Sequence, residues 1–107
     1  MPRVFKRAAA IGDLVEHYVH LEEQAGERLA DRFLASAEVS FVALSEHPEI
    51  GSALKLQRPE FAAMRKWRIR DFDNFLIFYE PRLDGVSVVR VLRASQDWWQ
   101  LFGLGGP

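Results

Sequence analysis

The sequence predicts a small two-layer α+β domain, because its first half has helical spacing and its second half alternates as strands do. Between residues 8 and 46 the apolar positions recur every three or four residues, which is the period of an amphipathic helix. Residues 63–93 hold runs rich in Val, Ile and aromatic residues, separated by Asp, Asn, Gly and Pro. At 107 residues the chain has room for one domain with a single core, residues 1–107.

A short strand is expected at residues 3–7, followed by an amphipathic helix that begins at Ala8. The residues of this helix predicted to face the core are Ala8, Ile11, Leu14, Val15, Tyr18 and either Leu21 or Glu22. Those predicted to face away are Asp13, Glu16, His17 and Glu23. Gly26 ends the helix, because glycine readily adopts the left-handed conformation that follows a helical segment.

A second helix follows, and with the first it forms an antiparallel helical hairpin. Its predicted core residues are Ala30, Phe33, Leu34, Ala37, Phe41 and Leu44. Pro48 and Gly51 end it, since the residue before a proline is pushed out of the helical region. Residues 52–62 have no clear period and are interpreted as a connector.

The remaining chain predicts a three-stranded antiparallel meander and a short C-terminal helix. Strands are expected at residues 63–70, 74–80 and 86–93, with turns at 71–74 and 81–85. The middle strand is apolar on both faces, which places it at the centre of the sheet. Ser95 is a suitable N-cap for the short helix that contains Trp98 and Trp99.

Charge is distributed unevenly along the chain, although the net charge is only −1. Residues 1–50 carry five basic and nine acidic side chains, whereas residues 51–107 carry nine and six. In the first strand of the meander Lys66, Arg68 and Arg70 share the face opposite Trp67 and Ile69. The helical hairpin can cover only one face of the sheet, so we expect the other to be a concave, partly exposed apolar surface with a basic rim, which suits a protein partner.

Composition excludes several other classes of protein. The chain is 49% apolar and 27% charged, an ordinary globular balance that argues against wholesale disorder. It has no run of eighteen apolar residues and no charged-then-apolar leader, which predicts a cytoplasmic protein without a membrane segment. It has no cysteine, which removes disulfides, thiolate nucleophiles and zinc-thiolate sites.

The order of these segments resembles the ParE toxins of the RelE/ParE superfamily. The residues that carry the resemblance are Met64–Ile69, Asn74–Tyr79, Asp84-Gly85 and Val88–Leu92, with the earlier Asp13-Leu14, Tyr18 and Pro48–Gly51. The resemblance implies a toxin that arrests growth by binding DNA gyrase and that a cognate ParD-like antitoxin neutralises. It also implies that operator DNA is met only indirectly, through the antitoxin. Where many relatives have Ala-Arg-Asp before the terminal helix, this chain keeps only Asp97.

Two alternatives remain open at this point. RelE-type members of the superfamily cleave mRNA on the ribosome, which requires proton-transfer groups and a cation to stabilise the phosphate. Those ribonucleases resemble one another in having an Arg in the middle strand and an Arg and a Tyr near the C-terminus. At these places this chain has Leu76 in the middle strand and Gln96 and Phe102 near the end. We therefore expect no catalytic residue and a toxin that acts by protein binding, with a RelE-like mRNA endonuclease or a non-toxic binding domain as alternatives.

The contact candidates combine clustered cations with residues of the C-terminal turn. Cations gathered in one half of a chain favour an acidic partner, and tryptophan is enriched at binding hot spots. The residues expected to contact the target or the antitoxin are Lys66, Arg68, Arg70, Arg90, Arg93, Asp97, Trp98 and Trp99. His17 and His20 are spaced for a metal ion but have no third ligand in view, so neither a metal nor a cofactor is expected.

Overall fold

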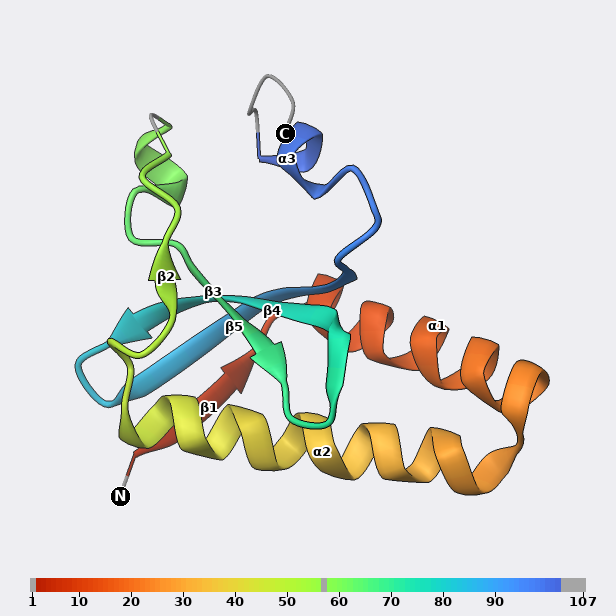
Figure 1. Ribbon diagram of the computed structural model, residues 1–107. Helices are drawn as coiled ribbons and strands as arrows, with labels where there is room; N and C mark the ends of the chain where they lie inside the picture. Colours follow the sequence, from red (N-terminus) through yellow and green to blue (C-terminus); the bar gives the residue numbers. More distant parts are fainter. Residues whose placement is uncertain (1, 57, 103–107) are drawn as a thin grey trace.

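The computed structural model describes residues 2–56 and 58–102 as a five-stranded sheet with a helical hairpin on one face (Figure 1). The elements in chain order are β1 (Arg3–Lys6), α1 (Ala8–Ala25), α2 (Glu27–Glu46), β2 (Ser52–Ala53), the 3-10 turn η1 (Pro59–Phe61), β3 (Arg65–Ile69), β4 (Phe72–Arg82), β5 (Gly85–Arg93) and α3 (Trp98–Leu101). This arrangement confirms the α+β fold class. No helix of these residues is long and apolar enough to cross a membrane.

The sheet has the strand order β1-β5-β4-β3-β2, with the expected meander at its centre. β1 runs parallel to β5, with Arg3 in register with Gly85. β2 runs antiparallel to β3 and pairs Ser52 with Lys66. The prediction that residues 52–62 form only a connector was wrong at Ser52–Ala53. The sequence pattern missed this strand because two residues are too few to show an alternation.

The helical hairpin begins and ends where the sequence pattern predicts. Gly26 lies between α1 and α2 with φ 96°, and its N–H bonds to the carbonyl of Glu22 at 2.9 Å. A residue with a Cβ is strained at such a positive φ, which explains the glycine. α2 ends at Glu46, just before His47 and Pro48.

The buried face of α1 differs from the prediction. Asp13 and His17, expected in solvent, are only 7% and 6% exposed, whereas Ile11 and Val15, expected in the core, are 49% and 58% exposed. The prediction followed hydrophobicity alone. The structure instead turns two polar side chains toward the edge of β5, where they bond to its backbone.

Both turns of the meander are shorter than predicted. Ile69 pairs with Phe72 and Arg82 pairs with Gly85, so each turn consists of only two residues. The remaining residues of the expected turns, 72–74, 81–82 and 85, belong to strands β4 and β5. Asp71 supplies the positive φ of 67° in the first turn, a conformation that Asp tolerates better than most residues.

β5 contains a bulge that breaks its alternation. Tyr79 pairs with Val88 while its neighbour Phe78 pairs with Arg90, so Val89 is an extra residue on β5. As a result Val88 and Val91 both belong to the core beneath the helices. Strict alternation would place them on opposite faces.

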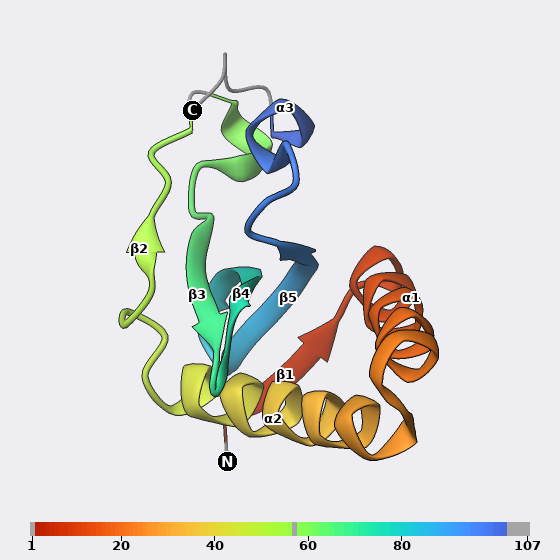
Figure 2. The same ribbon diagram turned by 45° about the vertical axis from the view of Figure 1, so that its right-hand side comes forward.

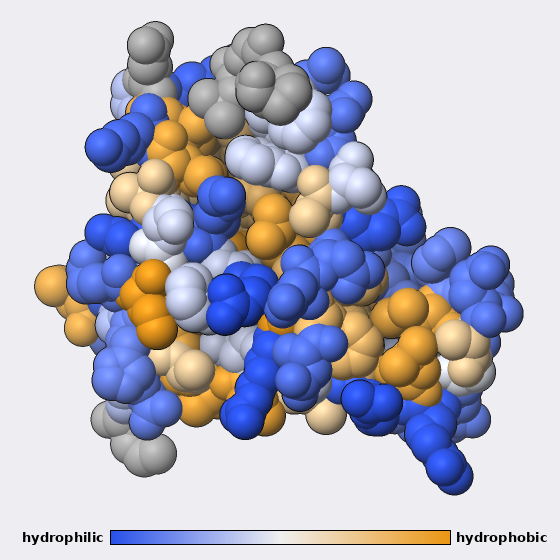
Figure 3. Space-filling model, in the orientation of Figure 1, coloured by the Kyte–Doolittle hydropathy of each residue, from blue (hydrophilic) through white to orange (hydrophobic). Residues whose placement is uncertain are grey.

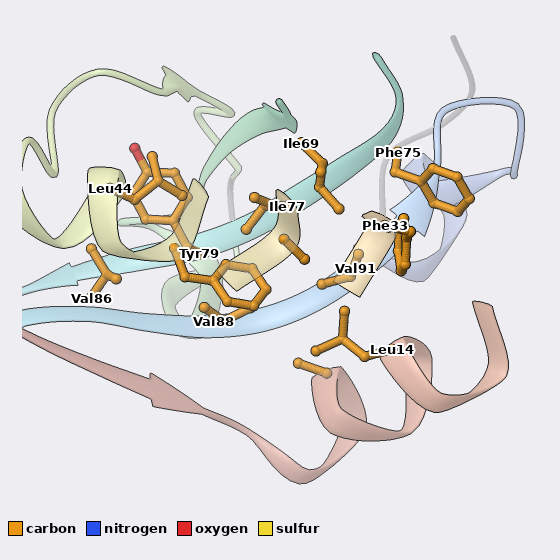
Figure 4. Packing of buried hydrophobic residues seen from close by; sticks show 13 residues of the cluster. Leu14, Phe33, Leu44, Ile69, Phe75, Ile77, Tyr79, Val86, Val88 and Val91 are labelled. Carbon is orange, nitrogen blue, oxygen red and sulfur yellow. The ribbon is translucent and has the colours of Figure 1, made fainter. Parts of the chain in front are cut away.

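Two apolar clusters lie on opposite sides of the sheet. The main core fills the space between the sheet and the helical hairpin, and Figure 4 shows Phe33 and Leu14 directed toward Val91 and Phe75. The second cluster lies on the other sheet face, which we call the outer face. It consists of Leu56, Met64, Phe78, Val89, Leu92 and Phe102, with Leu54, Phe61, Leu76 and Trp98 packed against it.

Two segments of the chain therefore cover the outer face in part. The segment around η1 and the segment that ends in α3 rise from the sheet and lie side by side (Figure 2), and the rings of Phe61 and Phe102 are 5.4 Å apart. The face is partly exposed, as expected, but the packing of these two segments onto it was not predicted. The face was predicted from strand patterns alone, which contain no information about where the connector and the C-terminal segment pack.

Candidate functional site

The outer face combines an aromatic cluster with basic side chains from the meander. Lys66 of β3 is in register with Phe78 of β4, which pairs with Arg90 of β5. One row further, Arg68 is in register with Leu76. Figure 3 shows apolar surface between the two rising segments, with hydrophilic residues around it. The face is thus a partly covered apolar surface with cations near its edges.

The C-terminal turn packs onto the centre of this face. The ring of Trp98 lies 5.3 Å from that of Phe78, and Phe102 lies 4.9 Å from it. Lys66 places its ammonium group 5.4 Å from the Trp98 ring, a cation–π contact. Trp99 packs edge-on against Trp98, and both indoles are only half-buried. Each therefore retains surface that a partner can cover.

Ser95 does not play the capping role expected of it at this helix. Asp97 occupies the N-cap position of α3, but its side chain makes no capping bond, and Ser95 lies two residues before it. Gln96 instead accepts the N–H of Arg93 through its side-chain oxygen at 2.6 Å. The short helix is thus tied back to the end of β5 by an amide side chain.

Arg68 and Arg70 lie together at the end of the sheet nearest to α2. Both are exposed, and Arg68 reaches Asp73 across the turn at 3.5 Å. The backbone N–H of Arg70 donates to Ser40 Oγ of α2 at 3.0 Å. The two arginines border an open groove of about 730 Å³, whose other lining residues are Val39, Ser40, Ala43, Ile50, Trp67, Asp71, Asp73 and Asn74.

Arg90 and Arg93 do not join the other cations. Arg90 donates through Nε and Nη2 to the two carboxylate oxygens of Asp13, at 2.7 and 2.8 Å, and this bond raises the pKa of Arg90. Arg93 lines a small pocket with Glu16 and Glu23 of α1. The five predicted cations are therefore split between β3, the β3–β4 turn and the edge of β5 beside α1.

The Asp13 cluster completes the edge of the sheet. β1 pairs with β5 only as far as Val88, and β5 continues to Arg93. Beyond that point Asp13 Oδ2 accepts the N–H of Val91 at 2.9 Å, and His17 Nε2 donates to the Val91 carbonyl at 2.8 Å. Two side chains of α1 thus take the place of a neighbouring strand. A polar pair on an otherwise apolar helix face is the signal that could have revealed this.

His17 is therefore a structural residue rather than a metal ligand. Burial lowers the pKa of His17 below its usual value of 6.5, with the nearby charge of Arg93 acting in the same direction, whereas the bond to the Val91 carbonyl and the charge of Asp13 oppose the shift. Because Nε2 donates to a carbonyl, the neutral ring carries its proton there. Within residues 2–56 and 58–102, no group of three or more His, Asp or Glu side chains could hold a metal ion.

Tyr79 of β4, a tyrosine that could in principle transfer a proton, is buried in the core. Tyr79 is fully buried; its hydroxyl donates to the carbonyl of Pro48 at 2.8 Å and accepts the N–H of Gly51 at 2.9 Å. Burial raises the pKa of Tyr79 above its usual value of 10.0. Its hydroxyl holds the loop after α2 in place and faces the helical side of the sheet, away from the outer face.

Comparison with known proteins gives a family and a fold. The family model described as "ParE toxin of type II toxin-antitoxin system, parDE" matches residues 4–98. Among solved structures, the chain is similar to one from the chromosomal ParDE TA system of P. aeruginosa, with 16% sequence identity and a TM-score of 0.69. That match covers 87% of this chain and 96% of the other, and at this identity it shows a shared fold. Comparison with curated protein sequences gives no match.

Proposed function

Because this chain belongs to the ParE toxin family of type II toxin-antitoxin systems, we propose that it arrests growth by binding DNA gyrase. A cognate ParD-like antitoxin neutralises it, and both act in the cytoplasm. The family match over residues 4–98 carries this proposal, and the chemistry of the outer face supports it.

The outer face is suited to binding rather than to cleavage of RNA. In-line cleavage requires a base, an acid and a cation around one phosphate. The centre of this face is filled by Phe78, Trp98 and Phe102, and the hydroxyl of Tyr79 is enclosed on the opposite side. Partly covered aromatic rings beside cations are instead typical of protein contacts.

We assign the target contact to the rim of the outer face and the adjoining β3–β4 turn. Lys66, Arg68, Arg70, Trp98 and Trp99 all keep exposed or half-exposed surface there. Arg90 is paired with Asp13, and Arg93 lies beside α1, so neither belongs to this contact. The two exposed arginines, Arg68 and Arg70, offer the sharpest test.

The proposal is tested by expressing the toxin and the double variant R68A/R70A in separate cultures, with soluble protein measured in each. The toxin is expected to arrest growth, induce a DNA-damage response and inhibit supercoiling by purified gyrase while total mRNA stays intact. R68A/R70A is expected to inhibit supercoiling at least about tenfold more weakly. R28A/R32A on α2 removes the same charge from the helical layer and serves as the matched control.

Two results would contradict the proposal. Normal growth at high soluble expression of the unmodified chain would remove the toxin activity itself. Rapid codon-linked cleavage of mRNA, with gyrase unaffected, would replace gyrase binding by the ribonuclease mechanism.

A further inference from the structure

A second group of cations lies at the end of the sheet formed by the β4–β5 turn. Arg3 of β1 is in register with Gly85, and Gly85 pairs with Arg82 of β4, so one row across three strands holds both arginines. Both side chains are exposed. Their Cζ atoms lie 5.2 Å and 4.3 Å from the ring centroid of Phe5. Two like charges are therefore gathered at one aromatic side chain.

The strand pattern directs this group to the outer face, away from the helices. Along β1, Val4 packs against the main core and Lys6 bonds to a carboxylate of α2. Because side chains alternate along a strand, Arg3 and Phe5 point the opposite way. Arg82 contacts the ring of Phe5 and so lies on the same side.

Arg7 extends the group along the outer face. Its guanidinium group donates to Ser87 Oγ at 3.3 Å and forms an ion pair with Glu80. Arg82 also has a carboxylate nearby, since its Nε lies 3.7 Å from Asp84, but both side chains of that pair are about half-exposed. Exposed ion pairs contribute little energy, so another anion can replace Asp84. We define the arginine patch as Arg3, Phe5, Arg7 and Arg82.

Charge is divided between the two layers of the molecule. α1 and α2 together carry eight acidic and only two basic residues. On the outer face, the three arginines of the patch and Lys66 bring four cations against the carboxylates of Glu80 and Asp84. A polyanion is therefore attracted to the outer face and repelled by the helical layer. The net charge of −1 opposes tight binding to a free polyanion, so a partner that already holds one is needed.

The arginine patch is well separated from the target contact proposed above. Arg70 lies just before β4, Arg82 is the last residue of β4, and Figure 1 shows the two turns at the two ends of this strand. β4 has 11 residues, and at about 3.3 Å per residue such a strand extends over roughly 30 Å along its path. One end of the sheet can therefore contact gyrase while the other contacts a different molecule.

We propose that the arginine patch binds the phosphate backbone of the DNA that gyrase holds, so that the toxin contacts enzyme and DNA together. The inference rests on the proposed function and adds a second partner at a separate surface. Duplex DNA carries a negative charge about every 1.7 Å of its axis, so several clustered cations can be paired at once. A guanidinium group also matches phosphate with two parallel N–H donors.

An acidic protein surface fits the patch less well than DNA does. Exposed ion pairs between proteins add little affinity, whereas each phosphate contact releases a counterion from DNA and strengthens binding. Backbone contacts carry no sequence information, so we expect the contact to be the same for different DNA sequences.

The test compares R3A/R82A with R28A/R32A, a matched control that removes two exposed arginines from α2. Calorimetry gives the affinity of each full-length toxin for purified gyrase alone and for gyrase bound to duplex DNA. R3A/R82A is expected to bind gyrase alone as tightly as the unmodified toxin does, and to bind the gyrase–DNA complex more weakly. Circular dichroism and thermal unfolding show whether each variant folds.

The salt dependence measures how many phosphate contacts are lost. Each contact contributes about 0.9 to the slope of log affinity against log salt concentration, so R3A/R82A should lower that slope by about 2. Between about 50 and 200 mM salt, binding of the unmodified toxin to gyrase–DNA should therefore weaken about tenfold more than binding of R3A/R82A. R3K/R82K keeps both charges and should retain the slope. If R3A/R82A does not fold, R3A alone should lower the slope by about 1.

Two results would overturn the inference and leave the proposed function intact. One is equal affinity and equal salt dependence of R3A/R82A and R28A/R32A for the gyrase–DNA complex. The other is an equal loss of affinity of R3A/R82A with and without DNA, which would assign the patch to the gyrase protein. If the unmodified toxin binds gyrase in neither form and does not arrest growth, the proposed function fails, and this inference fails with it.

Discussion

Asp13 is expected to be among the most important polar residues for stability, and the substitution Asp13→Ala tests this. The carboxylate is 7% exposed and accepts three hydrogen bonds, two from Arg90 and one from the backbone N–H of Val91. Alanine removes all three acceptors at once. It also leaves the Val91 N–H without a partner at the edge of β5.

The magnitude follows from two losses. Removing one partner of a buried ion pair costs about 3–5 kcal/mol, but the side chain of Arg90 is 30% exposed, so water can hydrate the guanidinium group and reduce this cost. A buried backbone N–H left unpaired costs about 1–3 kcal/mol. We therefore expect D13A to lower the free energy of unfolding by about 3 kcal/mol in total, a large part of the ~5–15 kcal/mol typical of a domain.

Equilibrium unfolding in urea measures this loss. With a slope of about 1–3 kcal/mol per molar urea, the midpoint of D13A should fall by about 1–3 M. E23A changes an exposed carboxylate on the same helix and should shift the free energy by no more than about 0.5 kcal/mol. Adding R90A to D13A should cost less than the sum of the two single changes, because the pair is already broken. A D13A midpoint equal to that of E23A would refute the reasoning.

Two further predictions concern pH and backbone conformation. Burial lowers the pKa of His17 in the folded state below 6.5, so the unfolded chain takes up a proton first as the pH falls. The contribution of His17 to the free energy of unfolding should therefore be fully present above about pH 6.5 and decrease below it. Urea midpoints measured across pH 4–8 should show a smaller loss for H17Q than for the unmodified chain. Gly85 has φ 147° and its Cβ position is occupied by the Arg3 backbone, so G85A should destabilise the protein strongly. Gly12 lies inside α1, where a methyl group added to it would meet no neighbour within 4 Å, so G12A should raise the free energy of unfolding by about 0.5–1 kcal/mol. Thermal unfolding of G85A and G12A distinguishes backbone strain from a general effect of an added methyl group. Equal changes in the unfolding temperature of the two variants would contradict this reasoning.

The candidate site could be predicted only in part. Lys66 and Arg68 lie two residues apart on β3 and follow the simple alternation of a regular strand, whereas Arg70, expected on the same strand, lies in the β3–β4 turn. Arg90 and Arg93 could not be assigned in the same way, because the bulge at Val89 shifts the register of β5. Whether these residues contact a target or an antitoxin stays a prediction.

The sequence by itself determined the fold class, the helical hairpin and the meander. These features depend on local signals: the spacing of apolar residues, the glycine after α1, the proline after α2 and the turn residues between strands. Each signal acts within a few positions of the chain, so it can be recognised without knowledge of distant residues.

Only the tertiary structure decided which surfaces remain uncovered. α1 turns Asp13 and His17 inward because the backbone of Val91, 78 positions after Asp13, has β4 on one side but no strand on the other. That rotation leaves Ile11 and Val15 exposed, and the C-terminal segment covers the outer face that strand patterns left bare. A buried polar group must find a hydrogen-bond partner wherever the fold supplies one, and local sequence contains no record of where that partner lies.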